Sequence, residues 1–375
     1  MALRPRILLI TPLPPPIHGS SMVSQTIKES KLLNEEFEMD FVNISTSRKV
    51  EEIQKASLWL YVIKLLRFLG AYFKVFWHLC TRKYDLCYLA ITCHGTPFIK
   101  DYPFVMLCKL FRRRVIIHQH NKGMSKDVDK WPYSWMLPRA YEGTKVMLLS
   151  KLLYSDIQNV VEEEQILVCP NGIPNSATFD QDMCEPSTPH LLFLSNLIES
   201  KGVYVLLDAC KILHDKGCEF ICDFVGGTTK EINTDTFASA VEMRGLKNSA
   251  IYHGPKYGKD KDLFWKHSSA FVFPTFYKDE CFPLVLLEAM QHHLPVVTTN
   301  EGGIPDIVIN GETGYICERK NVQQLAEKIE ILLNSAILRK QMGHAGFKRY
   351  KEFFTQDSFE KRISECLHSA ISQTN

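Results

Sequence analysis

Residues 270–290 have the sequence AFVFPTFYKDECFPLVLLEAM, in which a short apolar run leads through a polar loop into a second apolar segment. Residues 270–273 have the length and composition of a buried strand. Pro283 is welcome in the first turn of a helix, because its missing backbone donor would have no partner there. We therefore predict a helix that begins at about Phe282. A strand, a loop and a helix in this order are the repeating unit of a parallel α/β sheet.

The same unit recurs on both sides of this segment. Short apolar runs, each followed by a turn and a longer amphipathic stretch, lie at residues 6–11, 86–90, 115–118, 146–149 and 165–169, and again at 191–195, 220–225 and 295–299. This alternation predicts parallel strands joined by helices in both halves of the chain. The fold class is therefore α/β, with two sheets.

A chain of 375 residues is too long for one ordinary core and fits two domains with a cleft between them. Residues 174–189 contain three prolines and no periodic apolar pattern, so they are the best linker candidate. We place the boundary near residue 185, with domains at 1–185 and 186–355. Residues 356–375 are expected to form a last amphipathic helix.

Bulk composition excludes several classes of protein. The chain is 45% hydrophobic and 23% charged, which is typical of a compact globular protein. A net charge of +2 gives no general attraction for nucleic acid. The cysteines are scattered and lack metal-site spacing, so we expect neither disulfides nor a bound metal. The apolar run at residues 7–11 is too short for a signal peptide, which favours a cytoplasmic protein.

Two carboxylates, Glu280 and Glu288, are the strongest candidates for a functional site. The start of the predicted helix offers backbone amides and the positive end of the helix dipole to an anion such as a diphosphate. The amides belong to Cys281, Phe282, Leu284 and Val285. Carboxylates suit hydroxyl donors, so a sugar at one glutamate and a ribose at the other is a sensible assignment. The alternatives are a helix cap for Glu280 and a solvated side chain for Glu288.

The run from Glu280 to Glu288, followed by PVV at 295–297, GGIP at 302–305 and NGETG at 310–314, resembles the signature of the family 4 retaining glycosyltransferases, or glycosyl transferases group 1. The resemblance is strong over residues 190–318 and looser over the first half. It implies a GT-B architecture, with two Rossmann-like domains facing each other across a cleft. The first domain would bind the acceptor and the second the nucleotide-sugar, while the C-terminal helix would cross back to the first domain.

Four further positions are identified through this resemblance. Lys201 matches the family lysine that binds the donor diphosphate, whereas Asn196 stands where the family usually has an arginine. An amide can donate hydrogen bonds to phosphate but brings no charge. Gly19 matches one member of a frequent glycine pair after the first strand. His120 resembles the family histidine that faces the donor sugar, and His118 fits better as a strand residue.

The implied reaction moves a sugar from a nucleotide diphosphate sugar to an acceptor hydroxyl with retention of anomeric configuration. Lys201 and the helix amides would stabilise the departing diphosphate. Glu280 and His120 would position the sugar, and Glu288 would hold the ribose. No metal or cofactor is expected, because the nucleotide-sugar is a substrate. The setting would be cell-surface polysaccharide or glycolipid synthesis. A nucleotide-sugar epimerase and a catalytically silent sugar-nucleotide-binding subunit remain as alternatives.

Residues 56–79 form an unusually apolar stretch that Lys64, Arg67, Lys74 and His78 interrupt at helical spacing. Those charges argue against a transmembrane span. The stretch is either a helix packed in the first domain with one wet edge, or a helix resting on an anionic membrane surface. The basic residues 112–114 are either a solvated loop or a contact for phosphate or lipid headgroups. The expected partners are therefore a nucleotide-sugar, a glycan or lipid-linked acceptor, and the inner face of a membrane.

Overall fold

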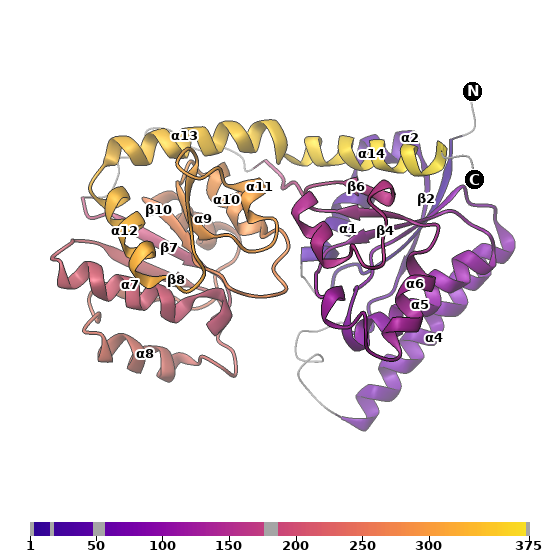
Figure 1. Cartoon of the computed structure of the whole chain (residues 1–375), viewed down its shortest axis with the longest axis horizontal. Helices are drawn as coiled ribbons and strands as arrows, with labels where there is room; N and C mark the ends of the chain where they lie inside the picture. Colours follow the sequence, from indigo (N-terminus) through magenta and orange to yellow (C-terminus); the bar gives the residue numbers. More distant parts are fainter. Residues whose placement is uncertain (1–3, 16–18, 48–56, 176–186, 373–375) are drawn as a thin grey trace. The chain divides into compact units, whose positions relative to one another are not determined.

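The computed structural model describes residues 4–15, 19–47, 57–175 and 187–372, and divides them between two compact units (Figure 1). The first unit contains Met1–Asn171 together with Gln356–Asn375, and the second contains Gly172–Thr355. The division thus falls before the boundary predicted near residue 185. Most of the predicted linker, residues 176–186, lies outside the described residues.

The first unit is built on a six-stranded parallel sheet with the strand order β2-β1-β3-β4-β5-β6. The strands are β1 (Arg6–Thr11), β2 (Glu38–Asn43), β3 (Leu86–Leu89), β4 (Val115–Gln119), β5 (Lys145–Leu148) and β6 (Ile166–Val168). The inner strands β3 and β4 are buried along their whole length, as expected for a sheet covered on both faces. The chain reverses the direction of strand addition between β1 and β3.

Helices surround this sheet. They are α1 (Gly19–Glu29), α2 (Lys31–Glu36), α4 (Leu58–Thr81), α5 (Gly95–Leu110), α6 (Tyr133–Tyr141) and α14 (Gln356–Ser372), with short 3-10 turns at Met124–Lys126, Lys151–Asp156 and Glu163–Gln165. No helix of the described ranges is both long and apolar enough to cross a bilayer.

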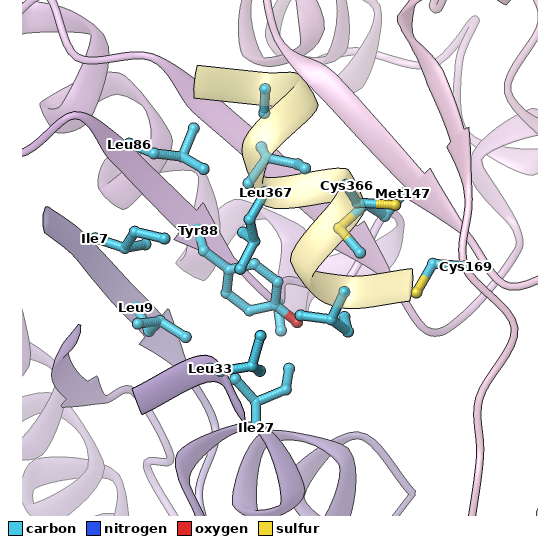
Figure 2. Close-up of a cluster of buried hydrophobic side chains, with 14 of the residues drawn as sticks. Ile7, Leu9, Ile27, Leu33, Leu86, Tyr88, Met147, Cys169, Cys366 and Leu367 are labelled. Carbon is cyan, nitrogen blue, oxygen red and sulfur yellow. The ribbon is translucent and has the colours of Figure 1, made fainter. Parts of the chain in front are cut away.

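The last helix, α14, completes the core of the first unit. Leu367 and Phe359 from α14 pack with Leu9 of β1, Leu33 of α2 and Tyr88 of β3 (Figure 2). The hydroxyl of Ser30, which caps α2, also donates a 2.6 Å hydrogen bond to Glu360. A segment at the end of the chain therefore belongs structurally to its beginning.

The second unit repeats the architecture with the strand order β12-β11-β10-β7-β8-β9. Its strands are β7 (His190–Leu194), β8 (Ile221–Val225), β9 (Ala250–Tyr252), β10 (Ala270–Phe273), β11 (Val296–Thr299) and β12 (Gly314–Cys317). Its helices are the 3-10 turn η4 (Glu199–Lys201), α7 (Val203–Asp215), α8 (Thr234–Met243), α9 (Gly258–His267), α10 (Leu284–Gln291), α11 (Ile304–Ile307), α12 (Val322–Leu333) and α13 (Ala336–Phe353). The prediction of two parallel α/β sheets is confirmed.

The start of α10 differs from the prediction. The helix begins at Leu284, and Pro283 is its N-cap with φ −68° and ψ 115° rather than a residue of its first turn. Phe282 precedes a proline, and steric conflict with the proline ring disfavours helical geometry at that position. The loop after β10 therefore extends through Pro283.

Replacing Leu367 by alanine should lower the free energy of unfolding of the first unit by about 2–5 kcal/mol. Leu367 is fully buried, so the shorter side chain leaves a cavity under α14. Urea denaturation followed by circular dichroism measures the change. The control is Leu110→Ala, the same substitution at a residue that is 76% exposed, which should change stability by no more than about 0.5 kcal/mol. Equal effects of the two substitutions would contradict the role given to α14.

Candidate functional site

Three loops converge at the carboxyl ends of neighbouring strands in the second unit. They follow β7, β10 and β11, which lie side by side in the sheet. The order of strand addition reverses between β7 and β10, and ligands of open α/β sheets bind at such a reversal point. The loop after β10 carries Glu280, and the loop after β7 leads to Lys201.

Two glycines fix the loop after β10 by letting other backbone segments approach it. A side chain at Gly202 would place its Cβ 2.3 Å from the carbonyl oxygen of Pro274, and one at Gly302 would lie 2.1 Å from the carbonyl oxygen of Glu280. Both glycines have positive φ, 91° and 56°. The amide of Gly303 also donates a 2.7 Å hydrogen bond to the carbonyl oxygen of Cys281. The sequence predicted a turn at residues 302–303. In the structure this turn packs against the backbone of the loop after β10.

Glu280 and Lys201, predicted separately, form an ion pair. Lys201 Nζ lies 2.5 Å from Glu280 Oε2, and the two side chains are only 16% and 10% exposed. The ammonium group also lies over the ring of Tyr277, 4.5 Å from its centroid, and 5.6 Å from that of Phe273. Glu280 is therefore paired with a side chain from another loop. It is not the N-cap of α10, because that residue is Pro283.

Glu288 lies on α10 and pairs with Lys261 of α9. The Nζ and Oε2 atoms are 2.6 Å apart, and the side chains are 24% and 26% exposed. Glu288 is therefore neither freely solvated nor fully buried. Sequence reasoning missed Lys261, because it belongs to the charged run of residues 259–262, which resembles the solvated face of any surface helix.

The residues that lead into α10 are well packed. Cys281 and Phe282 are 4% and 5% exposed, and the ring of Phe282 lies 5.9 Å from that of Phe354. Leu284 and Val285, in the first turn, are half-buried. The amides of a first helical turn have no partner within the helix, so they are available by geometry to an acceptor.

Asn196 connects the loop after β7 to the loop after β8. Its Oδ1 accepts a 3.2 Å hydrogen bond from the amide of Gly227. At Gly226, an added Cβ would lie 1.9 Å from the carbonyl oxygen of Ser195, so the two loops also touch through their backbones. An arginine could not accept the hydrogen bond from Gly227. The asparagine thus has a structural function here, and its carboxamide oxygen is already in use.

In the first unit, Gly19 and His120 line one cavity of 610 Å³ at the carboxyl ends of β1 to β4. The order of strand addition in this sheet reverses between β1 and β3. The lining is rich in hydroxyl and other polar groups: Ser20, Ser45, Thr46, Ser47, Thr92, Lys100, Asp101 and Asn121. An added Cβ at Gly19 would meet nothing within 4 Å, so packing does not require a glycine there.

The two histidines at the end of β4 differ in their surroundings. His118 is fully buried, its Nδ1 lies 2.7 Å from the hydroxyl of Tyr88, and burial holds its pKa well below the usual value. It is a residue of β4, as predicted, and it lies in the core. His120 follows the strand, is half-buried, and has its ring centroid 4.0 Å from that of His118. Only His120 reaches the cavity wall.

Asp101 is a buried carboxylate in this cavity that sequence reasoning missed. The residue is 3% exposed, it pairs with Lys100, and its Oδ2 accepts a 3.1 Å hydrogen bond from the amide of Thr92. Burial raises the pKa of its carboxyl group. The available signal was a lone acidic residue inside the largely apolar segment 95–110. The predicted site residues thus fall into two groups, one in each unit.

Comparisons with known proteins show what the sequence and the fold are similar to. Residues 181–349 match the model of the family described as Glycosyl transferases group 1. The capsular polysaccharide biosynthesis glycosyltransferase CapM of Staphylococcus aureus is 28% identical over 245 residues, which is 62% of this chain and 63% of CapM. The chain therefore spans less than two thirds of this curated relative.

Solved structures match over the whole chain. A glycosyltransferase from Rickettsia africae has a TM-score of 0.76 at 18% identity and covers 99% of this chain and 100% of its own. HepE of Anabaena, solved in complex with UDP, has a TM-score of 0.74 at 16% identity, with coverage of 97% and 100%. Residues 181–349 are therefore similar to the group 1 glycosyl transferases, and the two parallel-sheet units have the GT-B fold.

Proposed function

We propose that this protein transfers a sugar from a nucleotide diphosphate sugar to a hydroxyl group of a glycan or lipid-linked acceptor. The observation that carries the proposal is the loop after β10, which brings Glu280 and Lys201 together beside the start of α10. The neighbour HepE was solved with UDP, which supports a nucleotide-sugar donor. The name of CapM supports a role in polysaccharide synthesis at the cell surface.

The second unit would bind the donor. The ammonium group of Lys201 and the first amides of α10 would hold the diphosphate and stabilise the charge that develops as it leaves. Phosphate at Lys201 would compete with Glu280 for the same ammonium group, and this would release Glu280 Oε2 towards a sugar hydroxyl. Glu288 would accept hydrogen bonds from the ribose. Asn196 would support donor binding by holding its loop in place, and its side-chain NH2 group could donate a hydrogen bond to the diphosphate without adding charge.

The first unit would bind the acceptor in its cavity. Serine and threonine hydroxyls, the Asn121 side chain and the carboxyl group of Asp101 can each exchange hydrogen bonds with sugar hydroxyls. His120 lines the same cavity and, on the proposal, positions the sugar that is transferred. Gly19 would allow a ligand to approach the start of α1 closely.

The finer features of the reaction belong to the proposal too. We infer that anomeric configuration is retained and that neither a metal nor a cofactor takes part, as the resemblance to the retaining family implies. The protein would act in the cytoplasm and would contact the inner face of the membrane through α4.

The decisive experiment is a panel of UDP-, GDP- and ADP-sugars, scored by thermal shift and by release of the nucleoside diphosphate with and without acceptor. We expect one nucleotide to stabilise the protein and acceptor to increase release. Conversion of the donor to an isomer without acceptor would instead identify an epimerase. Binding with no turnover on glycan or lipid-linked acceptors would identify a silent sugar-nucleotide-binding subunit.

Replacing Glu288 by alanine should weaken binding of the preferred nucleotide by about tenfold or more, because hydrogen bonds from ribose to a carboxylate are lost. Isothermal calorimetry with the nucleoside diphosphate and its 2′,3′-dideoxy analogue measures this. The native protein should prefer the natural nucleotide, whereas the variant should bind both alike. Glu242→Ala is the matched control, since Glu242 also pairs with a lysine at 2.6 Å, on α8. A variant that still prefers the natural nucleotide would refute the ribose role.

Replacing Gly302 by alanine should displace Glu280, because the new Cβ has no room beside the carbonyl oxygen of that residue. We expect loss of most donor binding in thermal-shift titrations and a decrease in stability of about 1–3 kcal/mol from the strained backbone. Gly245→Ala is the control for strain alone, since Gly245 has φ 71° and open space around it. It should destabilise the unit modestly and leave donor binding intact. Unchanged donor binding in Gly302→Ala would contradict the proposed donor site.

A further inference from the structure

Helix α4 exposes an apolar stripe to solvent. Six residues with helical spacing, Leu58, Val62, Leu65, Leu69, Phe73 and Phe76, are between 38% and 83% exposed and form the α4 apolar face. Figure 1 shows α4 as a long helix at the outside of the first unit. Single exposed apolar residues are ordinary, but a contiguous stripe of this kind marks an interaction surface.

The opposite side of α4 packs against the first unit and carries basic residues. Phe68 and Tyr72 contact the ring of Phe104 with centroid distances of 5.5 and 5.9 Å. Lys64 and Arg67 are half-buried on this side. One alternative from the sequence was a packed helix with one wet edge. Of the four basic residues in the helix, Lys74 is exposed, and Lys64, Arg67 and His78 are half-buried. The helix has its apolar face outward, which is the reverse of an ordinary surface helix.

The surroundings of the α4 apolar face are basic. Helix α4 contains no aspartate or glutamate, and Lys74, the residue after Phe73, is exposed. At its carboxyl end, Phe76 contacts the ring of Phe111 at 5.8 Å, which places the exposed Arg112 next to the stripe. Two copies of this face would bring like charges together. A surface that is apolar and anionic suits it better.

Aromatic residues at both ends of the helix specify the occupant further. Trp59 and Tyr61 are 72% and 62% exposed near the start, and Trp77 is 67% exposed near the end. Tryptophan and tyrosine favour the boundary between lipid headgroups and acyl chains. We propose that α4 lies in the plane of an anionic lipid bilayer, with its apolar face among the outermost acyl segments and its basic residues near phosphate groups.

Helix α4 also contacts the cavity of the first unit. The guanidinium of Arg67 donates a 2.9 Å hydrogen bond to the carbonyl oxygen of Thr46, whose residue lines that cavity. A helix seated on lipid would therefore hold the cavity wall next to the membrane surface. Resting on the proposed function, this contact favours a lipid-linked acceptor over a freely soluble glycan.

Vesicle co-sedimentation of the full chain tests the lipid surface. We expect the protein to bind vesicles of phosphatidylglycerol and phosphatidylethanolamine more strongly than vesicles of phosphatidylcholine alone. The double variant Leu65→Glu with Phe73→Glu should bind about tenfold or more weakly, because carboxylates replace the inserted side chains. Met243→Glu and Ile337→Glu, which alter residues that are 77% and 73% exposed in the second unit, should bind like the native protein. All variants are checked for unchanged thermal stability.

Three results would overturn the inference. They are no binding of the native protein to either vesicle, equal binding by the double variant, and a dimer in light scattering that the double variant dissociates. Lys74→Glu should weaken binding to the anionic vesicles only. The donor panel is run on the same samples, and the double variant should keep its nucleotide thermal shift while it loses turnover on a lipid-linked acceptor. If no nucleotide raises the melting temperature of the native protein, the proposed function is disproved and the vesicle result is unaffected.

Discussion

The proposed donor site depends on the close packing of the loop after β10 between two other backbone segments. Gly202 and Gly302 both have positive φ, and each has a carbonyl oxygen of the loop where a side chain would begin. Because the loop backbone is held on both sides, the pairing of Glu280 with Lys201 requires little further loss of backbone freedom. Charged groups that are mostly buried need this kind of fixed geometry, since an unpaired one would be strongly destabilising.

Each of the two glutamates has a lysine partner inside the same unit. Glu280 pairs with Lys201 and Glu288 with Lys261. Both carboxylates are thus neutralised in the absence of a ligand, and a ligand has to exchange contacts with them rather than fill open positions. On the proposed donor mode this exchange favours a molecule with both anionic and hydroxyl groups. The phosphate would pair with a lysine, and the sugar or ribose hydroxyls would donate hydrogen bonds to the glutamate from which that lysine has separated.

The two sheets were predictable because apolar runs and turns are local properties of the sequence. Motif spacing also singled out Glu280 and Lys201, whose side chains the structure brings together. The start of α10 was predicted too early, since the effect of Pro283 on Phe282 outweighed its fitness for a first turn. The partners were not predictable. Lys261 meets Glu288 only through the packing of α9 on its neighbours, and the contact between Asn196 and Gly227 requires two loops from adjacent strands.

Helix α4 shows why periodicity predicts a helix but not its orientation. The sequence left open whether the basic side of this helix, with Lys64 and Arg67, faces water or an anionic membrane surface. The fold instead uses the guanidinium of Arg67 to satisfy the carbonyl oxygen of Thr46 and packs Phe68 on Phe104. On the inference that α4 lies on a lipid surface, the bilayer would cover the apolar residues that the fold leaves exposed, and anionic headgroups would pair with the basic residues of the helix.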